Sequence, residues 1–337
     1  MERLTLVTGA AGFIGFHCAR ELLEGGEAVV AIDNLNGYYA VDLKQARLSE
    51  LRRYGNFRFH QVDIADATAL DAALGGLPIT RVLHLAAQAG VRYSLENPQA
   101  YVASNLVGHV NILEFCRHRP EIEHLAYASS SSVYGRGSKL PYSETEKADR
   151  PASLYAATKR ADELMSEAYA SLYDLRQTGL RFFTVYGPWG RPDMAVWLFT
   201  DAILNGKEIK LFDGGHGRRD FTYIDDAVAG ALAILDRPPA YGAPQHQVYN
   251  VGNGSPITVI ELLRLVEEAT GLRARTVAAP KQAGDVDHTA ADISAIARDF
   301  GFAPKMPIRK GVAAFVEWYR RQYPAANENL PLAQVEG

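Results

Sequence analysis

The segment LTLVTGAAGFIG, residues 4–15, decides the fold of this 337-residue chain. A short apolar run, 4–7, breaks into a glycine-rich turn, and a helical pattern then continues to about Gly25. A second apolar run, 28–33, follows that helix and ends on Asp33. A strand, a glycine turn, a helix and a second strand in this order form the repeating unit of a parallel sheet with helices on its faces.

The same alternation continues through the first half of the chain. Apolar runs at 57–62, 81–85, 124–128 and 180–185 predict further strands, and helical patterns separate them. Long amphipathic helices are expected at about 101–117 and 153–173, after Pro98 and Pro151, because proline suits the first turn of a helix. The sequence therefore predicts an α/β fold with a Rossmann-type, doubly wound parallel sheet.

Beyond residue 187 the pattern changes to shorter runs divided by glycine and proline. We interpret this region as a smaller C-terminal α/β substrate domain that closes over the carboxyl ends of the sheet strands, where such folds bind ligands. The expected cofactor domain spans residues 1–180 and about 217–252, and the substrate domain spans about 181–216 and 253–323. Residues 324–337 show no periodicity and are expected to be disordered.

Composition limits the classes of partner. Lys and Arg number 35 against 39 Asp and Glu, a net charge of −4 without a basic block, so neither nucleic acid nor a membrane surface is an expected partner. The two cysteines, Cys18 and Cys116, suggest neither a disulfide framework nor a metal site, which favours a reducing, cytoplasmic setting. We find no signal-peptide pattern and no apolar stretch of about 18 residues, so we expect an untargeted protein.

Three glycines mark the first turn as a candidate phosphate site. Gly9, Gly12 and Gly15 follow the spacing G-x-x-G-x-x-G, where backbone amides and a helix N-terminus can face a pyrophosphate. Asp33 lies 18 residues after Gly15, where a carboxylate accepts hydrogen bonds from ribose hydroxyls and repels a 2′-phosphate. The pattern predicts NAD rather than NADP as the cofactor; an ordinary turn aspartate is the alternative for Asp33.

Tyr155 and Lys159 are the candidate catalytic pair. They are four residues apart in the second long helix, so both side chains lie on one face. An ammonium beside a phenol favours the phenolate, which can act as a general base near neutral pH. Four serines, 129–132, end the preceding strand, and their hydroxyls can reach the same substrate oxygen. The alternatives are an exposed Tyr/Lys pair, and serines that only satisfy backbone groups.

Together these residues resemble the extended short-chain dehydrogenase/reductase family of nucleotide-sugar enzymes, from Leu4 to about Trp318. The resemblance implies bound NAD and a tyrosine that removes a proton from a sugar hydroxyl while a hydride passes to the nicotinamide. It also implies a set of cofactor-binding residues: Gly9, Gly12, Phe13, Ile14, Gly15, Asp33, Asn34, Asp63, Ile64, Leu85, Ala86, Ala87, Asn105, Tyr155, Lys159 and Phe182.

The serine run separates the activities within that family. Dehydratases of the family carry Thr-Asp-Glu where this chain has Ser130, Ser131 and Ser132, so the acid/base pair that dehydration needs is missing. Decarboxylases of the family usually keep the glutamate that Ser132 replaces here. Epimerisation at C4 of the sugar is the activity that remains, with Tyr155, Lys159 and Ser130 as its catalytic residues.

Three further segments, 33–39, 88–94 and 183–194, resemble the UDP-glucuronate 4-epimerases of the family. This resemblance implies UDP-glucuronate and UDP-galacturonate as the UDP-sugar partners, with a UDP-glucose 4-epimerase or a UDP-glucuronate decarboxylase as alternatives. Hydroxyls of Ser131, Ser132 and Thr184 would hold the sugar carboxylate, and Arg191 would add a charge-assisted pair. Pairing of Arg191 with Asp193 or with a phosphate is the alternative.

The nucleotide end of the site is assigned by resemblance alone. Arg219 matches the family arginine that neutralises the diphosphate, and an ion pair with Asp220 or Asp225 is the alternative. The other candidates for contact with the UDP-sugar are Arg92, Phe212, Gln282 and Asp285. The two long helices carry broad apolar stripes, which favours a homodimer. A non-catalytic dinucleotide-binding protein is a further hypothesis, against which the intact Tyr155 and Lys159 argue.

Overall fold

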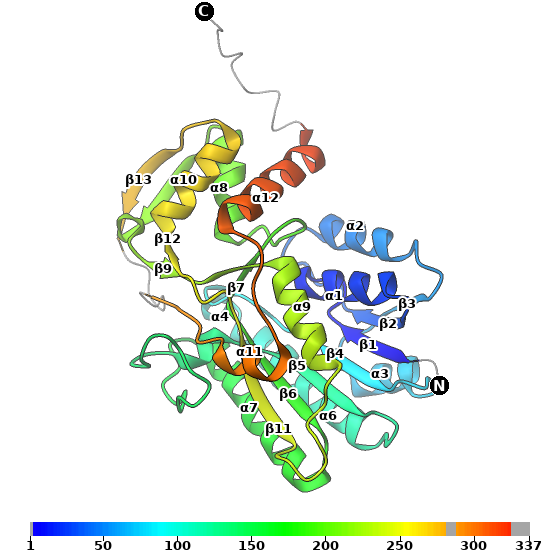
Figure 1. Cartoon of the computed structure of the whole chain (residues 1–337). Helices are drawn as coiled ribbons and strands as arrows, with labels where there is room; N and C mark the ends of the chain where they lie inside the picture. The colour runs from blue at the N-terminus through cyan, green and yellow to red at the C-terminus, as the bar shows by residue number, and fades with distance from the viewer. Residues whose placement is uncertain (1–2, 281–287, 325–337) are drawn as a thin grey trace, which may run out of the picture.

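A seven-stranded parallel sheet forms the centre of the molecule (Figure 1). The computed structural model describes residues 3–280 and 288–324. The strand order is β11-β6-β5-β4-β1-β2-β3, and each neighbouring pair is parallel. The strands are β1 (Leu4–Thr8), β2 (Ala28–Asp33), β3 (Phe57–Gln61), β4 (Arg81–His84), β5 (His124–Ser130), β6 (Gln177–Phe182) and β11 (His246–Val251). Because the order reverses between β1 and β4, the ligand crevice is expected at the carboxyl ends of these two strands.

Successive residues of β1 point to opposite faces of the sheet, and each face has its own core. Leu6 is buried in one cluster with side chains from α3 (Ala67–Leu74) and α6 (Gly108–Arg117), and α7 (Leu154–Tyr173) lies beside α6. Val7 is buried in the other cluster with α1 (Phe13–Glu24) and α9 (Ile224–Leu235). Further helices on this second side are α2 (Val41–Leu51), against α1, and α11 (Ser294–Phe300), against α9 and β11. Helices cover both faces, which confirms the predicted doubly wound Rossmann-type fold.

The helix expected at 101–117 is present and is wider than an α-helix in its first part. It comprises α5 (Pro98–Tyr101), a π-helical segment η1 (Val102–Val107) and α6, after a short helix α4 (Tyr93–Glu96). Within η1, the Asn105 side chain accepts from Gln88 N at 2.8 Å and donates to Gln88 O at 3.1 Å. It also donates to Thr158 Oγ1 at 3.0 Å, so η1 ties the loop after β4 to α7.

The prediction of a single strand at 180–185 is wrong, because the chain changes hydrogen-bond partners within this range. The strand β6 ends at Phe182, and Phe183 N donates to Val251 O at 3.1 Å. Thr184 N donates instead to Asp220 O at 3.1 Å, which starts β7 (Thr184–Tyr186) beside β10 (Phe221–Tyr223) in a separate two-stranded sheet. An apolar run conceals this change, since both strands are buried.

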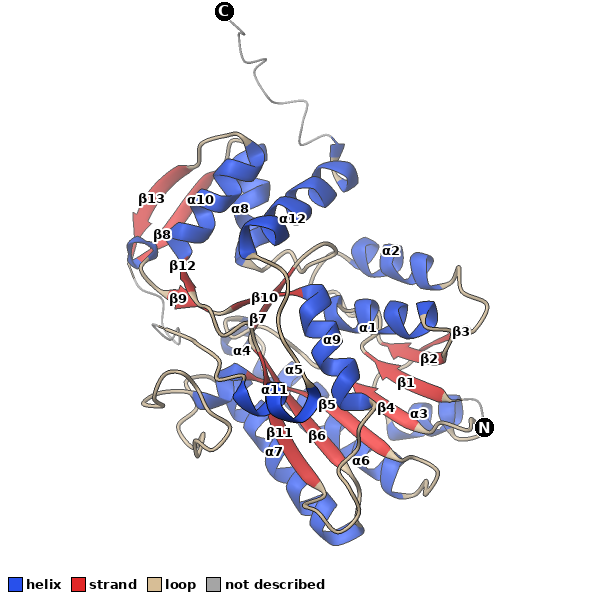
Figure 2. Cartoon of the chain, in the orientation of Figure 1, coloured by secondary structure: helices blue, strands red, loops and turns tan. Residues whose placement is uncertain are grey.

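A smaller layer of helices and strands faces the carboxyl ends of the central sheet (Figures 1 and 2). Its parallel pair of strands is β8 (Glu208–Phe212) with β13 (Arg275–Ala279), and its antiparallel pair is β9 (Arg218–Arg219) with β12 (Ile257–Thr258). Its helix α10 (Val259–Thr270) packs against α8 (Ala195–Leu204) and α12 (Ile308–Gln322). Thr258 and Glu261 form a capping box that starts α10. The predicted tail from residue 325 onward lies outside the described residues.

Within the described residues, 3–280 and 288–324, no helix is both long and apolar enough to cross a membrane.

Candidate active site

A cleft of about 950 Å³ lies between the carboxyl ends of the central strands and the smaller layer. The predicted residues that line it come from both parts of the fold. They are Gly9, Gly12, Phe13, Ile14, Gly15, Asp33, Asn34, Ile64, Leu85, Ala86, Ala87, Arg92, Ser130, Ser131, Ser132, Tyr155, Lys159, Phe182, Thr184, Arg191, Phe212 and Arg219.

Four predicted site residues are not part of this lining as the structure describes it. Asn105 is buried behind it, where it holds the loop after β4. Asp63 accepts a hydrogen bond from the Asn34 side chain at 2.9 Å, beside the cleft. Gln282 and Asp285 lie outside the described residues.

The glycine turn brings the start of α1 against the chain after β4. Gly9 has a φ of +71°, and a Cβ there would lie 2.7 Å from Ala86 N. A Cβ on Gly15 would lie only 2.1 Å from Gly9 O, so neither position has room for a side chain. Gly12 begins the helix without a side chain, which leaves the amides of the first turn directed at the cleft. These features fit the pyrophosphate of a dinucleotide, which the N-terminus of α1 would stabilise.

Asp33 is fixed at the end of β2 by backbone amides. Its Oδ2 accepts from Ala11 N at 3.1 Å and its Oδ1 accepts from Leu35 N at 2.8 Å. Burial raises the pKa of Asp33, and the nearby ammonium of Lys44 and the two backbone donors act in the opposite direction. Asp33 is 8% exposed and lines the cleft, where adenosine ribose hydroxyls would meet it. The residues present therefore fit NAD.

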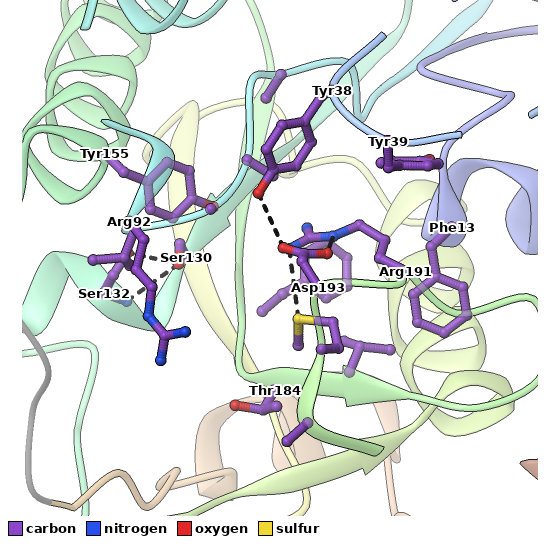
Figure 3. Close-up of a pocket in the computed structure, with 18 of the residues that line it drawn as sticks. Phe13, Tyr38, Tyr39, Arg92, Ser130, Ser132, Tyr155, Thr184, Arg191 and Asp193 are labelled. Carbon is purple, nitrogen blue, oxygen red and sulfur yellow. Dashed lines mark hydrogen bonds and ion pairs between the residues drawn. The ribbon is translucent and has the colours of Figure 1, made fainter. Parts of the chain in front are cut away.

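Tyr155 and Lys159 lie on the face of α7 that borders the cleft. Ser153 caps the helix by accepting from Ala156 N at 3.1 Å, so Tyr155 belongs to the first turn. Lys159 is 3% exposed, and its Nζ donates to Ala128 O at 2.9 Å. In Figure 3 the Tyr155 ring and Ser130 border the same cavity.

The four serines at the end of β5 and directly after it do not share one environment. Ser129 is buried at the wall of the cleft, and its Oγ donates to Glu163 Oε1 at 2.6 Å, so this hydroxyl is committed to the protein. Ser130 Oγ accepts from Ser132 N at 3.2 Å and from Ser132 Oγ at 2.8 Å. Ser131 lines the cleft beside them in a short 3-10 turn, η2 (Ser131–Tyr134). Three neutral hydroxyls therefore border the cavity at the positions predicted from the sequence.

Arg191 is paired with Asp193, which is one of the two alternatives that the sequence leaves open for this arginine. Its Nε lies 2.9 Å from Asp193 Oδ1 and its Nη2 lies 2.8 Å from Asp193 Oδ2. The Tyr38 hydroxyl donates to the same Oδ2 at 3.1 Å, from the loop after β2 (Figure 3). Burial acts to raise the pKa of Asp193, but Arg191 and the Tyr38 hydroxyl more than offset it, and the pKa is lowered. Asp193 is predicted only as the alternative partner of Arg191, and Tyr38 is predicted only as part of the similar segment 33–39.

Arg92 and Phe212 meet across the cleft. The Arg92 guanidinium lies 5.5 Å from the centre of the Phe212 ring, which joins the central domain to the end of β8. Arg219 lies in β9 and also lines the cleft. Asp220, one of its possible partners, is buried, and its carboxylate accepts from the backbone N–H groups of Asn253, Gly254 and Ala291.

Sequence reasoning missed Arg47, a fully buried arginine of α2. Its guanidinium donates to Ala11 O at 2.8 Å in the glycine turn and to the Tyr39 hydroxyl at 2.7 Å. It also donates to the carbonyls of Trp189 and Gly190 in the loop before Arg191. Arg47 thereby connects the glycine turn to the loop that precedes Arg191. An arginine in a helix carries no signal of such contacts, since its partners are distant in sequence.

The fold and the cleft define a dinucleotide-dependent enzyme of the Tyr–Lys type, with a second layer shaped for a further ligand. Residues 5–252 match the family model described as the NAD dependent epimerase/dehydratase family, and the chain belongs to this family.

Several relatives are similar over nearly the whole chain. UDP-glucuronate 4-epimerase 2 of Arabidopsis thaliana is 46% identical, over 97% of this chain and 78% of the relative. A probable UDP-glucuronate 4-epimerase of Rhizobium meliloti is 44% identical, over 96% of this chain and 99% of the relative. The solved structure of a UDP-glucuronic acid 4-epimerase from Bacillus cereus, in complex with UDP-glucuronic acid and NAD, has a TM-score of 0.86 and 32% identity. It covers 95% of this chain and all (100%) of the Bacillus chain.

Proposed function

We propose that this protein catalyses the NAD-dependent, reversible epimerisation of UDP-glucuronate to UDP-galacturonate at C4, through a transient 4-keto sugar. The observation that carries the proposal is the row of neutral hydroxyls, Ser130 to Ser132, beside Tyr155 and Lys159 in one cleft. No carboxylate stands in that row to serve as the acid or base of a dehydration. The similarity to UDP-glucuronate 4-epimerases supports the same activity.

The catalytic roles follow from where the side chains lie. Tyr155 removes the proton of the sugar 4-hydroxyl and later returns it, and Ser130 hydrogen-bonds the same oxygen. Lys159 supplies a positive charge next to Tyr155 and an N–H for the ribose of the cofactor. Bound NAD would supply the reversible hydride acceptor that inversion at C4 requires, with the hydride returned to the opposite face of the ketone.

The sugar carboxylate would lie between the serine row and the smaller layer. Ser131 and Ser132 come from the sheet side, and Thr184 comes from β7 on the other side of the cleft (Figure 3). Arg191 would supply the charged partner of the carboxylate. Since Arg191 is paired with Asp193, the substrate must share or replace that carboxylate.

The nucleotide would extend toward the smaller layer. Arg219 would pair with the diphosphate and Phe212 would pack against the uracil, next to Arg92. Gln282 and Asp285 remain proposed contacts of the uridine. We place the reaction in a reducing compartment such as the cytoplasm, because both Cys18 and Cys116 are buried free thiols.

We further propose that the protein is a homodimer. Exposed apolar side chains lie on the helical face opposite the sheet, with Leu164 56% and Leu172 71% exposed on α7. Val102 and Val107 of η1 are 37% and 45% exposed. Paired helices from two copies would bury these groups in a four-helix interface.

Product analysis tests the proposed function. Purified protein incubated with UDP-glucuronate is expected to form UDP-galacturonate, observed by NMR, without added cofactor. Carbon dioxide and a UDP-pentose would identify a decarboxylase. Turnover of UDP-glucose alone would identify an epimerase of neutral sugars, and either result would refute the proposal.

A further inference from the structure

Lys159 has an acidic partner that the mechanism above does not use. Asp162, three residues later on α7, places its Oδ2 3.0 Å from Lys159 Nζ. The side chains of Lys159 and Asp162 are 4% and 1% exposed. Because Nζ also donates to Ala128 O, two of the three N–H bonds of an ammonium are committed to the protein. One N–H is left for the cleft.

The other ionisable groups around Asp162 are neutral or paired elsewhere. On its own helix, Glu163 forms a two-bond ion pair with Arg181, with both distances 2.8 Å, and a third contact with Arg160 at 2.7 Å. From α6, burial lowers the pKa of His109 well below its usual value, so this imidazole is neutral. From β5, burial raises the pKa of Tyr127, so this phenol is neutral as well.

His84 of β4 faces the Lys159 side of the pair. Burial lowers the pKa of His84 to about 3, which keeps its ring uncharged, and its Nδ1 lies 2.7 Å from Thr8 Oγ1. Among the residues that the structure describes, Asp162 is thus the acidic group in direct contact with the ammonium. Its second oxygen, Oδ1, is buried and has no hydrogen-bond partner in the described part of the chain.

We propose that Asp162 is a positioning residue that sets the effective charge of Lys159 on Tyr155 and on the cofactor site. When ionised, Asp162 makes a neutral pair with Lys159, and the field of the ammonium at Tyr155 is weakened. When protonated, it leaves the full positive charge in place. The proposal rests on the proposed function for the roles of Tyr155 and Lys159.

The buried position of Asp162 places its titration near neutral pH. Burial raises the pKa of Asp162 to about 7, and the opposing effect of Lys159 does not restore the usual value. As the pH falls through this range, Asp162 takes up a proton and the ammonium favours the phenolate more strongly. The activity should therefore fall toward acid pH by less than the tenfold per pH unit that one isolated base would give.

The variant Asp162→Asn separates charge from geometry. An amide oxygen still accepts from Lys159, but the negative charge is gone at every pH. The acid limb of the kcat profile is then expected to move to lower pH by about 1 unit. Bound cofactor, measured by its near-ultraviolet absorbance after addition of UDP-sugar, should be reduced to a greater extent, because a positive charge disfavours the oxidised nicotinamide.

Two further variants serve as references. Glu167→Gln removes one negative charge from the same helix, but Glu167 is 67% exposed and pairs with His246 rather than with Lys159. It should keep the wild-type pH profile. Asp162→Glu retains the charge and should restore the wild-type profile. If Asp162→Asn does not fold, Asp162→Ser replaces it, with the same shift expected.

Stability without sugar provides a readout that does not depend on the substrate. A carboxyl whose folded pKa lies above its unfolded value loses stability as the pH rises through the window from about 4 to about 7. The wild type should therefore lose unfolding free energy relative to Asp162→Asn as the pH rises through that window, because the variant has no carboxyl to ionise at this position. The proposal would be overturned by a folded Asp162→Asn variant that keeps three wild-type properties: the pH profile of kcat, the fraction of bound cofactor in its reduced form, and the pH dependence of stability. Failure of UDP-glucuronate as a substrate would contradict only the proposed function.

Discussion

At the scale of single residues, Tyr155 carries the most specific expectation of the mechanism. Tyr155→Phe keeps the ring, which packs against Tyr101 at 6.1 Å between ring centres, and removes only the hydroxyl. We expect kcat to fall by about 10²–10⁴-fold, the usual cost of losing a general base, while binding of the UDP-sugar changes little. Steady-state kinetics and calorimetric titration measure the two effects. A variant with the wild-type kcat would exclude Tyr155 as the base.

Arg191 tests how the 4-keto intermediate is protected. A 4-keto-glucuronate is a β-keto acid and loses carbon dioxide when its carboxylate turns perpendicular to the ketone. If Arg191 and the hydroxyls of Ser131, Ser132 and Thr184 hold the carboxylate, Arg191→Ser should still oxidise C4 but release UDP-4-keto-pentose.

Mass spectrometry of the Arg191→Ser products decides between two roles. The expected mixture contains the keto-pentose, with reduced cofactor accumulating on the enzyme. If Arg191 binds only phosphate, substrate binding weakens and the product is still purely UDP-galacturonate. Asp193→Asn is the reference variant, since it removes the negative charge that competes for Arg191 and should not release pentose.

The residues that could be predicted from the sequence belong to local patterns. Two motifs could be recognised because their residues are close together in the sequence. They are the glycine turn, with Gly9, Gly12 and Gly15, and the pair of Tyr155 and Lys159. Arg47 and Asp162 could not be assigned in this way. The contacts of Arg47 come from residues 11, 39, 189 and 190, and the importance of Asp162 depends on its burial.

At the scale of elements, the turn between β1 and α1 depends on close backbone contact. Gly15→Ala would place a Cβ 2.1 Å from Gly9 O, which is a backbone atom and cannot rotate away. The turn must shift, so the variant should lose its bound NAD during purification. Gly55→Ala is the matched control, since a Cβ there meets nothing within 4 Å. Cofactor released by heat from equal amounts of protein measures retention, and a full complement of NAD in Gly15→Ala would contradict this account.

Periodicity predicts which elements exist better than where each element changes partners. The strands β1, β2, β4 and β5 follow runs that are visible in the sequence, since parallel strands inside the sheet are buried on both faces, whereas β3 is an edge strand and is only partly buried. The break between β6 and β7 is invisible, because buried apolar residues continue through Phe183. The π-helical turn in η1 is also hidden, since its side chains keep a helical pattern while the backbone widens.

At the scale of the whole molecule, the exposed apolar face of α7 tests the proposed dimer. Leu164→Glu places a charge where a second copy would pack, so we expect a monomer in light scattering at micromolar concentration. Leu140→Glu is the control, since Leu140 is 46% exposed but lies outside the helices of the proposed interface. A wild-type protein that is already monomeric, or a Leu164→Glu dimer, would contradict this assembly.

The central claim is that a hydride leaves C4 of the sugar and returns to the same carbon within one closed site. UDP-glucuronate that carries deuterium at C4 tests it most directly, with products analysed by NMR and mass spectrometry. The account predicts UDP-galacturonate that retains the deuterium at C4, formed without added cofactor and without a pentose. Loss of the deuterium to solvent, or the absence of UDP-galacturonate, would contradict it.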